Sequence, residues 1–477
     1  MTIKEELRPQ DRPGLGYWIP LSFQHVFAMF GATILVPLLT GLSPSTALFT
    51  AGTGTLIYIL CTGAKIPAFL GSSFSFIPPI LAVAGGPGGP NMAYVMGGAI
   101  AAGVFYCLVA LVIKFAGTKW LDRAMPPVVI GSVIVIIGLF LAPTAMSMAM
   151  QTQVPNEARI ALESLPPESQ AALPEGYIEN MPKMINQYSL VYLSIAAFTL
   201  IVTVIANIFF KGFFGAIPIL IGLISGYCFT LIMGLVLPET AYNIINFDVV
   251  AKAKWFSFPR PEVTRPDGST YLIKAPAFSF IAILTFIIVS LATICEHLGD
   301  MVVVSKVVGQ DFYKNPGLHR TLTGDGLASI WAAFWGGPPN TTYSENIGVM
   351  AITRVYSVWV LGGAAVIAVL LSLFQKFGAL IQTIPTPVLG GISMLLFGII
   401  ASSGLRTIVE SGVDFKDKRN LTITSVMLVI GVGGGELAFR LTENLDFKLA
   451  GVALATVVGI ILNLIFPITK ANAEKQG

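Results

Sequence analysis

Two acidic residues, Glu296 and Asp300, stand four positions apart inside a long apolar stretch of the chain. Residues at this spacing share one face of a helix. Two carboxylates so close together in a low-dielectric medium cannot both be ionised cheaply, so the pair suits the uptake and release of a proton. Alternatively, Asp300 lies near the end of the apolar stretch at Val307 and could be hydrated there. His297 lies about 100° around the helix from Glu296, so we expect it to orient Glu296 or a facing helix.

A third acid, Glu345, belongs to a polar run, Pro-Pro-Asn-Thr-Thr-Tyr-Ser-Glu-Asn-Ile-Gly at 338–348, within apolar surroundings. The two prolines cannot continue a helix from Trp335. The Asn-Thr-Thr that follows favours extended backbone, and Asn346 to Val355 favours a short helix. Irregular backbone at membrane depth is tolerated only where it is buried in protein or lines a cavity, so we expect Glu345 to be a site residue. The alternative is a loop at the membrane surface, where Glu345 would simply be solvated.

A second broken segment, Gly-Ser-Ser-Phe-Ser-Phe-Ile-Pro-Pro at 71–79, places serines on both sides of Phe74. Extended backbone here would offer free N–H and C=O groups, and the phenyl ring would offer a flat surface. This combination suits a small planar polar ring, stacked on one face and hydrogen-bonded around its edge. The alternative is that Phe74 is an ordinary core residue.

The composition is that of a helical protein with many membrane spans. Of the 477 residues 55% are hydrophobic and 11% charged, and the mean hydropathy is +0.79, whereas soluble domains carry about 25% charged residues. The net charge of +3 gives no reason to expect nucleic acid as a partner. The four cysteines have no paired spacing, so we predict neither a disulfide framework nor a metal site. Because no nucleophile–base set appears in the spans, we expect neither a cofactor nor an enzyme.

Apolar stretches long enough to cross a bilayer predict an all-α polytopic fold with about fourteen spans. Clear candidates are residues 18–39, 45–62, 91–113, 125–145, 189–210, 213–236, 277–303, 358–374, 388–405, 420–434 and 447–467; a less regular one is 322–336, and the two broken ones are 72–84 and 340–355.

The basic residues of the short loops predict the orientation in the membrane. They place both termini inside and the two long loops, 146–188 and 238–276, outside. Prolines in these two loops predict little regular structure. We interpret His319, Arg320 and Asp325, at the start of a span, as a polar cluster at the inner surface.

Internal echoes predict two related halves. The run Pro-Val-Val-Ile-Gly-Ser at 127–132, followed by Gly138, resembles Pro-Val-Leu-Gly-Gly-Ile at 387–392, followed by Gly398. Gln24-His25 likewise matches Glu296-His297, and each pair precedes its broken segment by the same distance. Because each half holds seven spans, an odd number, the halves should be inverted, with their discontinuous segments meeting at the midplane.

Four runs of sequence resemble the nucleobase–ascorbate transporter family (nucleobase:cation symporter 2), in its bacterial uracil-carrying branch. They are Leu-Ser-Phe-Gln-His-Val-Phe-Ala-Met-Phe-Gly-Ala-Thr at 21–33, Lys-Ile-Pro-Ala-Phe-Leu-Gly-Ser-Ser-Phe at 65–74, residues 311–322 with Pro-Gly-Leu-His-Arg, and, most specifically, residues 339–356 with Asn-Thr-Thr-Tyr-Ser-Glu-Asn-Ile-Gly. The resemblance covers nearly the whole chain except the two long outer loops.

The resemblance implies a fold and a function. It implies fourteen spans in two inverted repeats of seven, with a short strand in spans 3 and 10. Residues 1–123 and 277–380 would form a core domain, and 124–276 and 381–477 a gate domain. The implied activity is uracil–proton symport across the cytoplasmic membrane by a homodimer joined through its gate domains.

The resemblance also implies roles for individual residues. The substrate-binding set would be Ala32, Ser73, Phe74, Glu296, Tyr343, Ser344 and Glu345; proton coupling would involve Glu296, His297, Asp300 and Glu345; the gate would carry Ser393 and Phe397.

Three positions depart from the uracil-carrying branch. Ser344 stands where that branch has glycine, Asp300 where it has a second histidine, and Phe397 where it has a gate tyrosine. Asp300 resembles the purine-carrying branch, so a xanthine or uric acid symporter is the alternative within the family. An anion exchanger of related architecture is a further alternative, but it would need basic groups or bare helix N-termini at the site.

Overall fold

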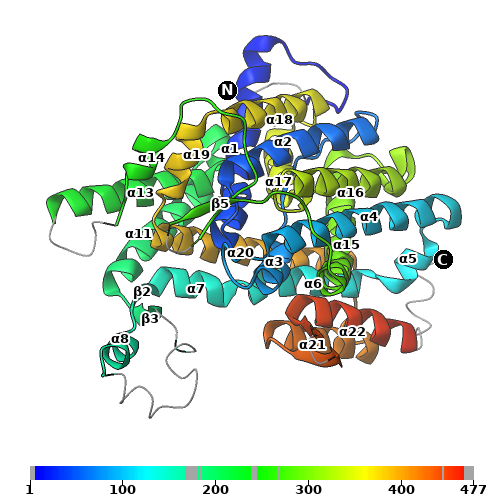
Figure 1. The fold of residues 1–477 in the computed structure, drawn as a ribbon. Helices are drawn as coiled ribbons and strands as arrows, with labels where there is room; N and C mark the ends of the chain where they lie inside the picture. The colour runs from blue at the N-terminus through cyan, green and yellow to red at the C-terminus, as the bar shows by residue number, and fades with distance from the viewer. Residues whose placement is uncertain are drawn as a thin grey trace.

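Long apolar helices make up most of the structure (Figure 1), a computed structural model that describes residues 6–166, 181, 184–237, 244–265, 268–442 and 445–466. Within these residues eight helical segments are long and apolar enough to cross a membrane, which confirms a polytopic protein. They are α1 (Leu15–Thr40), α2 (Pro44–Cys61), α4 (Met92–Ala116), α6 with α7 (Pro127–Phe140 and Ala142–Met150), α11 (Leu190–Phe209), α13 (Pro218–Val236), α15 (Phe280–Val308) and α20 (Thr386–Glu410).

Shorter helices account for the remaining predicted spans. They are α3 (Ile77–Ala84), α16 (Leu318–Phe334), α17 (Ser344–Thr353), α18 (Val358–Leu373), α21 (Lys418–Val432) and α22 (Gly451–Ile465). Each predicted span therefore coincides with helix over most of its length. The last one begins later than predicted, because residues 447–450 belong to a strand.

Local sequence signals set the helix ends. The Ser43 hydroxyl caps α2 by accepting from the backbone N–H of Thr46, and Pro44 occupies the first turn, where its missing N–H costs nothing. Ser279 caps α15 in the same way. At the other end of α15, Gly309 has φ +72°, a left-handed conformation that glycine adopts without strain.

The two broken segments meet as a pair of short strands, which confirms the strands predicted there. Strand β1 (Leu70–Ser72) pairs antiparallel with β6 (Asn340–Thr342), with Gly71 opposite Thr341. A short 3₁₀ turn, η1 (Phe74–Phe76), and α3 continue from β1, and α17 continues from β6. Thus two half-helices begin where the strands end.

Hydroxyl groups of neighbouring helices satisfy the outer backbone of both strands. Thr55 of α2 accepts from the N–H of Leu70 at 2.9 Å. Ser329 of α16 accepts from the N–H of Asn340 at 3.1 Å and donates to its carbonyl at 3.0 Å. Since no water is available at membrane depth, these hydroxyls replace the sheet neighbours that a two-stranded ladder lacks.

The helices pack in two groups. In one, α2, α4, α16 and α18 pack against each other, and α1 and α15 lie against this group. In the other, α6, α7, α11, α20 and α21 are in contact (Figure 1). The groups meet where α15 contacts α6 and where α1 contacts α13. The paired strands belong to the first group, at its boundary with the second.

The two long loops contain more regular structure than their prolines predict. In the first long loop, β2 (Gln151–Pro155) pairs with β3 (Met184–Tyr188), and α8 (Glu157–Glu163) lies between them, projecting from the helices in Figure 1. In the second, α14 (Asp248–Lys252) precedes the pair β4 (Glu262–Thr264) and β5 (Thr270–Leu272). The prediction of irregular loops was therefore wrong for these stretches. Residues 167–180, 182–183, 238–243 and 266–267 of the loops, and 1–5 and 467–477 at the chain ends, lie outside the described residues.

We predict that Gly71→Ala destabilises the pairing of β1 with β6. A Cβ atom at position 71 would lie 2.5 Å from the ring of Tyr343, and this ring is held by hydrogen bonds of its hydroxyl group. Such overpacking costs about 1–3 kcal/mol, so the midpoint of thermal unfolding in detergent should fall. Gly398→Ala in α20 is the matched control, because a Cβ there meets nothing within 4 Å. Equal midpoints for the two variants would contradict this account.

Candidate functional site

A cavity of about 380 Å³ lies at the ends of the paired strands, between the two helix groups. Its described lining includes six of the residues singled out from the sequence: Phe74, Glu296, Asp300, Tyr343, Ser344 and Glu345. The second helix group contributes Ile134 of α6, Pro218 and Ile219 of α13, and Ile399 to Thr407 of α20. The predicted residues therefore come together although they are distant in sequence.

Glu296 and Asp300 both face this cavity, as their spacing on one helix predicts. The Oε2 atom of Glu296 accepts from the Ser75 hydroxyl at 3.3 Å, and the Oδ1 atom of Asp300 accepts from the Ser344 hydroxyl at 2.5 Å. Asp300 is 4% exposed, and its Oδ2 atom has no hydrogen-bond partner among the described residues. The alternative of a hydrated helix end for Asp300 was therefore wrong.

Glu345 lies in the first turn of α17, directly after β6. The first backbone N–H groups of a helix have no partner within the helix, and their dipoles favour a negative charge. Glu345 also lines the cavity, so the alternative of a solvated surface loop was wrong. Three carboxyl groups from two elements thus share one partly enclosed space.

Two aromatic side chains, Phe74 and Tyr343, also line the cavity. Phe74 is 4% exposed, and its ring meets that of Phe397 edge-to-face, with centroids 5.7 Å apart. Phe397 belongs to α20, so this contact joins the two helix groups. The Tyr343 hydroxyl donates to the carbonyl of Ser72 at 3.0 Å and accepts from Thr33 at 3.2 Å, which fixes the ring across both strands.

Other predicted site residues lie near the cavity but are not among its described lining. Ala32 is fully buried in α1, and Ser73 and Ser393 are fully buried, with hydroxyl oxygens that have no partner among the described residues. These two unsatisfied hydroxyls lie on β1's continuation and on α20, one in each helix group. Their contact with a bound molecule stays a prediction.

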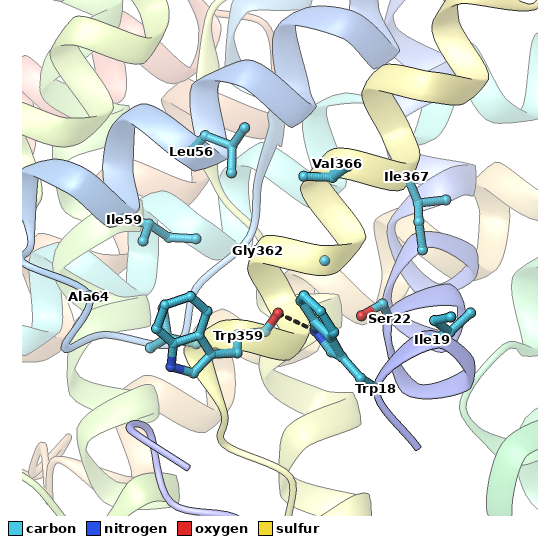
Figure 2. A pocket seen from close by; sticks show the side chains of 12 residues that line it. Trp18, Ile19, Ser22, Leu56, Ile59, Ala64, Trp359, Gly362, Val366 and Ile367 are labelled. Carbon is cyan, nitrogen blue, oxygen red and sulfur yellow. Dashed lines mark hydrogen bonds between the residues drawn. The ribbon is translucent and has the colours of Figure 1, made fainter. Parts of the chain in front are cut away.

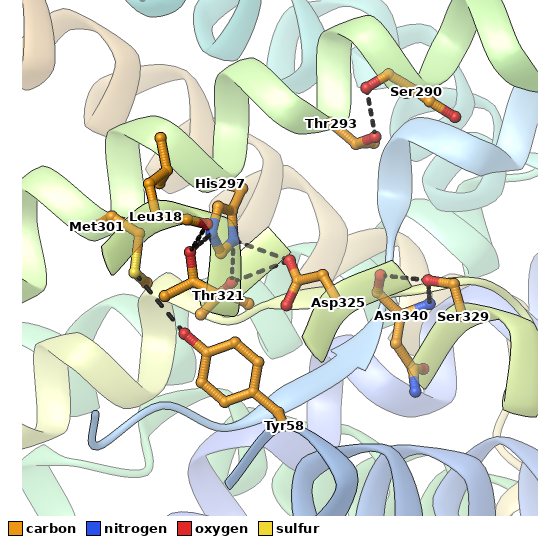
Figure 3. A network of polar contacts seen from close by, with 11 residues as sticks. Tyr58, Ser290, Thr293, His297, Met301, Leu318, Thr321, Asp325, Ser329 and Asn340 are labelled. Carbon is orange, nitrogen blue, oxygen red and sulfur yellow. Dashed lines mark hydrogen bonds and ion pairs between the residues drawn. The ribbon is translucent and has the colours of Figure 1, made fainter. Parts of the chain in front are cut away.

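His297 is not among the described lining of the cavity and lies in a fully buried polar network (Figure 3). Its Nδ1 atom lies 2.8 Å from Oδ2 of Asp325 and 2.9 Å from the Thr342 hydroxyl, and its Nε2 atom lies 2.8 Å from the Thr321 hydroxyl. The prediction that His297 orients a facing helix is confirmed, because Thr321 and Asp325 belong to α16. It makes no described contact with Glu296.

The hydrogen bonds require a proton between His297 and Asp325. The Thr321 hydroxyl either donates to Nε2 or, when it donates to the carbonyl of Leu318 at 2.9 Å, accepts from Nε2–H, according to the tautomer of His297. A lone pair on Nδ1 would face a carboxylate oxygen at 2.8 Å, so a proton must lie on one of the two. The pair links α15, α16 and β6 beneath the cavity.

Asp325 differs most from its predicted surroundings. It was interpreted as part of an inner-surface cluster with His319 and Arg320, yet it is fully buried. One signal was present: Asp325 lies within the predicted span 322–336, and an acid inside a membrane span is a functional candidate by default.

Arg406 was not singled out from the sequence, but it lines the cavity from α20. Its Nε atom donates to Glu410 at 2.5 Å, and Glu410 also meets Lys306 of α15 at 3.4 Å. The cavity thus extends from the buried acids to a charged cluster that touches both helix groups.

Comparison with known proteins identifies the family. A model of a permease family matches residues 16–167 and 176–437. The chain belongs to the nucleobase–ascorbate transporter family. Members of this family are permeases, so the chain is a membrane transport protein and not an enzyme.

Similar family members match almost end to end. The chain is 48% identical to a uracil permease of Bacillus subtilis, over 98% of this chain and 96% of that one. It is 46% identical to a uracil permease of Bacillus caldolyticus, over 99% and 97%, and 43% identical to one of Escherichia coli, over 96% and 92%.

Solved structures share the fold at low sequence identity. The transmembrane domain of the cyanobacterial bicarbonate transporter BicA superposes with a TM-score of 0.61 at 15% identity, covering 97% of this chain and all of that one. Murine SLC26A9, an anion transporter in an inward-facing state, gives 0.61 at 11% identity, covering 96% and 69%. These likenesses concern the fold alone.

We predict that His297 and Asp325 stabilise the protein as a coupled pair. His297→Ala or Asp325→Ala alone leaves a buried polar partner unsatisfied, which costs about 1–3 kcal/mol. The double variant should be less destabilised than the sum, with a coupling of about 0.5–3 kcal/mol. Thermal unfolding of the four proteins measures this coupling. Asp325→Ala combined with Glu410→Ala is the control, since the two residues share no described partner and their effects should add; additive effects for His297 with Asp325 would refute the pairing.

Proposed function

We propose that the protein imports uracil across the cytoplasmic membrane by symport with protons. The observation that carries the proposal is the cavity in which three carboxyl groups, an aromatic ring and the ends of two strands converge. Uracil is a small planar ring whose edge presents two N–H donors and two carbonyl acceptors. Carboxylate oxygens can accept from the former, and backbone N–H groups or protonated acids can donate to the latter. Relatives named uracil permease, at 43–48% identity, support this substrate.

Proton coupling follows from the cost of charge. Three carboxylates in one largely apolar cavity repel each other and lose hydration, so binding a proton to at least one of them lowers the free energy. Glu345, at the helix N-terminus, is best placed to stay ionised and to read the N–H edge of the base. Glu296, one turn from Asp300, is best placed to hold the proton.

Movement of the two helix groups against each other would give alternating access. We assign the first group to the core domain (1–123 and 277–380) and the second to the gate domain (124–276 and 381–477). The Phe74–Phe397 contact and the Lys306–Glu410 ion pair cross this boundary, so both must rearrange when the site changes sides. Phe397 and Ser393 would then act as gate residues.

Two inverted repeats of seven spans remain part of the proposal. Supporting it, β1 and β6 pair antiparallel, and each receives a hydroxyl from the helix before it, Thr55 or Ser329. The homodimer is proposed through the gate helices α11 and α13. Only 28% of the residues in their apolar stretches are buried, against 56–72% in the other spans. Both chain termini would lie on the cytoplasmic side.

Transport measured in proteoliposomes tests the function. An inward-directed proton gradient should drive accumulation of radiolabelled uracil, and an uncoupler should abolish it. Excess unlabelled uracil should compete, whereas xanthine and uric acid should not. Uptake that ignores the gradient would refute symport, and stronger competition by xanthine would favour the purine carrier to which Asp300 points. Competition by bicarbonate or sulfate is not expected, because buried acids repel anions.

We predict that Phe74→Ala weakens uracil binding to purified protein by about 1–3 kcal/mol, the range found for bases stacked on aromatic side chains. Phe74→Tyr should be tolerated better than Phe74→Leu, because stacking needs a flat ring while core packing needs only apolar volume. Binding measured by calorimetry distinguishes the two. If Leu serves as well as Phe, the residue is core filling.

A final prediction separates the two glutamates. Glu296→Gln mimics the protonated acid, so uracil binding should persist while gradient-driven accumulation is lost. Glu345→Gln replaces an acceptor oxygen by a donor, so binding itself should fall. Calorimetry reports the binding and proteoliposome uptake reports the accumulation. Normal binding by Glu345→Gln together with lost binding by Glu296→Gln would reverse the assignment.

A further inference from the structure

A second cavity, of about 390 Å³, lies outside the transport site, between α1, α2 and α18 (Figure 2). Its walls are apolar and include Leu56, Ile59, Val366 and Ile367. It lies where α1 and α18 begin and α2 ends, so it is at one surface of the apolar layer. We call it the α1–α2–α18 groove.

Two tryptophans lie at the end of the groove that is nearest the surface of the apolar layer. The Trp18 indole donates to the carbonyl of Trp359 at 2.6 Å, and Figure 2 shows both rings at the same end of the cavity. Tryptophan is enriched at the headgroup level of membranes. From Trp359 the groove continues along α18 to Ile367, about 12 Å deeper at 1.5 Å per residue. Its apolar walls therefore follow the direction of a lipid chain.

A fixed cation stands over this end. The guanidinium carbon of Arg12 lies 3.8 Å from the centroid of the Trp359 ring, and Arg12 is exposed. In the described part of the chain it has no carboxylate partner within ion-pair distance. The N-terminal segment that carries it is pinned in place. Val358 N–H donates to the carbonyl of Pro9, and the Gln10 side chain donates to the carbonyl of Ala64, next to Lys65.

We propose that the α1–α2–α18 groove binds one phospholipid with an anionic headgroup. An acyl chain would lie along the apolar walls, and the phosphodiester would lie beside Arg12, whose planar guanidinium can donate two hydrogen bonds to phosphate oxygens. A surface cation supplies both the attraction and the preference over a zwitterionic lipid. Because the groove is built on core helices, the lipid would stay with the core domain while the gate domain moves.

Native mass spectrometry of the purified full-length protein tests this. Phosphatidylglycerol and phosphatidylethanolamine with identical acyl chains are the two probes. The wild type should retain one phosphatidylglycerol, bound about five-fold more tightly than phosphatidylethanolamine, as expected for one surface cation. Arg12→Gln should bring the two affinities together. Equal binding of both lipids by the wild type, or an unchanged preference in Arg12→Gln, would overturn the headgroup assignment.

A second pair of variants tests the groove itself. A Cβ at Gly362 meets only Ile59 Cδ1, at 3.7 Å, so Gly362→Leu fills the groove without disturbing the helix contacts. Val366→Phe fills the groove from its wall. This second variant replaces Gly362→Leu in the test if Gly362→Leu folds poorly. Either should lose the bound phosphatidylglycerol, while Leu111→Phe, on the exposed face of α4, keeps it. If both groove variants retain the lipid, the bound molecule is lipid held elsewhere on the protein surface, and the proposal is overturned.

Discussion

Backbone hydrogen bonding without water is the constraint on which the rest of this structure depends. Strands β1 and β6 interrupt two spans, and each carries N–H and C=O groups that a bilayer cannot satisfy. Their mutual pairing satisfies one edge, and Thr55 and Ser329 satisfy the other. Because each strand needs the other as its hydrogen-bond partner, the pairing of β1 with β6 holds the two halves of the chain together. The η1 turn and the half-helix α17 then begin at opposite ends of this short ladder, and both border the cavity.

The pairing of β1 with β6 also explains why three acidic side chains are tolerated at the cavity. Glu345 lies in the first turn of α17. The residue before Glu345 is Ser344, and its hydroxyl group donates to the carboxyl group of Asp300. Glu296 accepts from Ser75, within the turn that follows β1. Each carboxyl group is therefore tied to a residue just after a strand, so under the proposed function a change in the charge of one acid would act directly on the segment that positions the base. Beneath them, the His297–Asp325 pair joins α15 to α16 and fixes the helix from which Glu296 and Asp300 project.

Much of this arrangement could be predicted from the sequence. Membrane helices are recognised by the length of their apolar stretches, and interruptions of these helices are recognised by prolines and runs of polar residues. The Glu296–Asp300 face and the strand positions followed from helical periodicity and from Pro338 and Pro339. Asp325 could not be placed in this way, since its partner His297 is 28 positions away and only tertiary packing brings them together. Arg406 was missed for a related reason: a cation near a helix end reads as a loop charge unless the cavity is known to reach it. The strand pairs of the two long loops were missed because prolines near strand ends look like disorder. In the first loop, the pairing strands β2 and β3 are also separated by residues 156–183.

The same fold serves anion transporters, and the charge at the strand ends suggests how one architecture can serve different substrates. Two helix N-termini directed at a midplane cavity form an anion site unless something else neutralises them. In this chain carboxyl groups stand at that place, so the positive ends of the half-helices are matched from within the protein. Under the proposed function, a neutral base would approach without importing charge, and a proton would be the species whose binding alters the electrostatics of the cavity. On this reasoning, the identity of one residue at the start of α17 would influence both what is carried and which ion accompanies it.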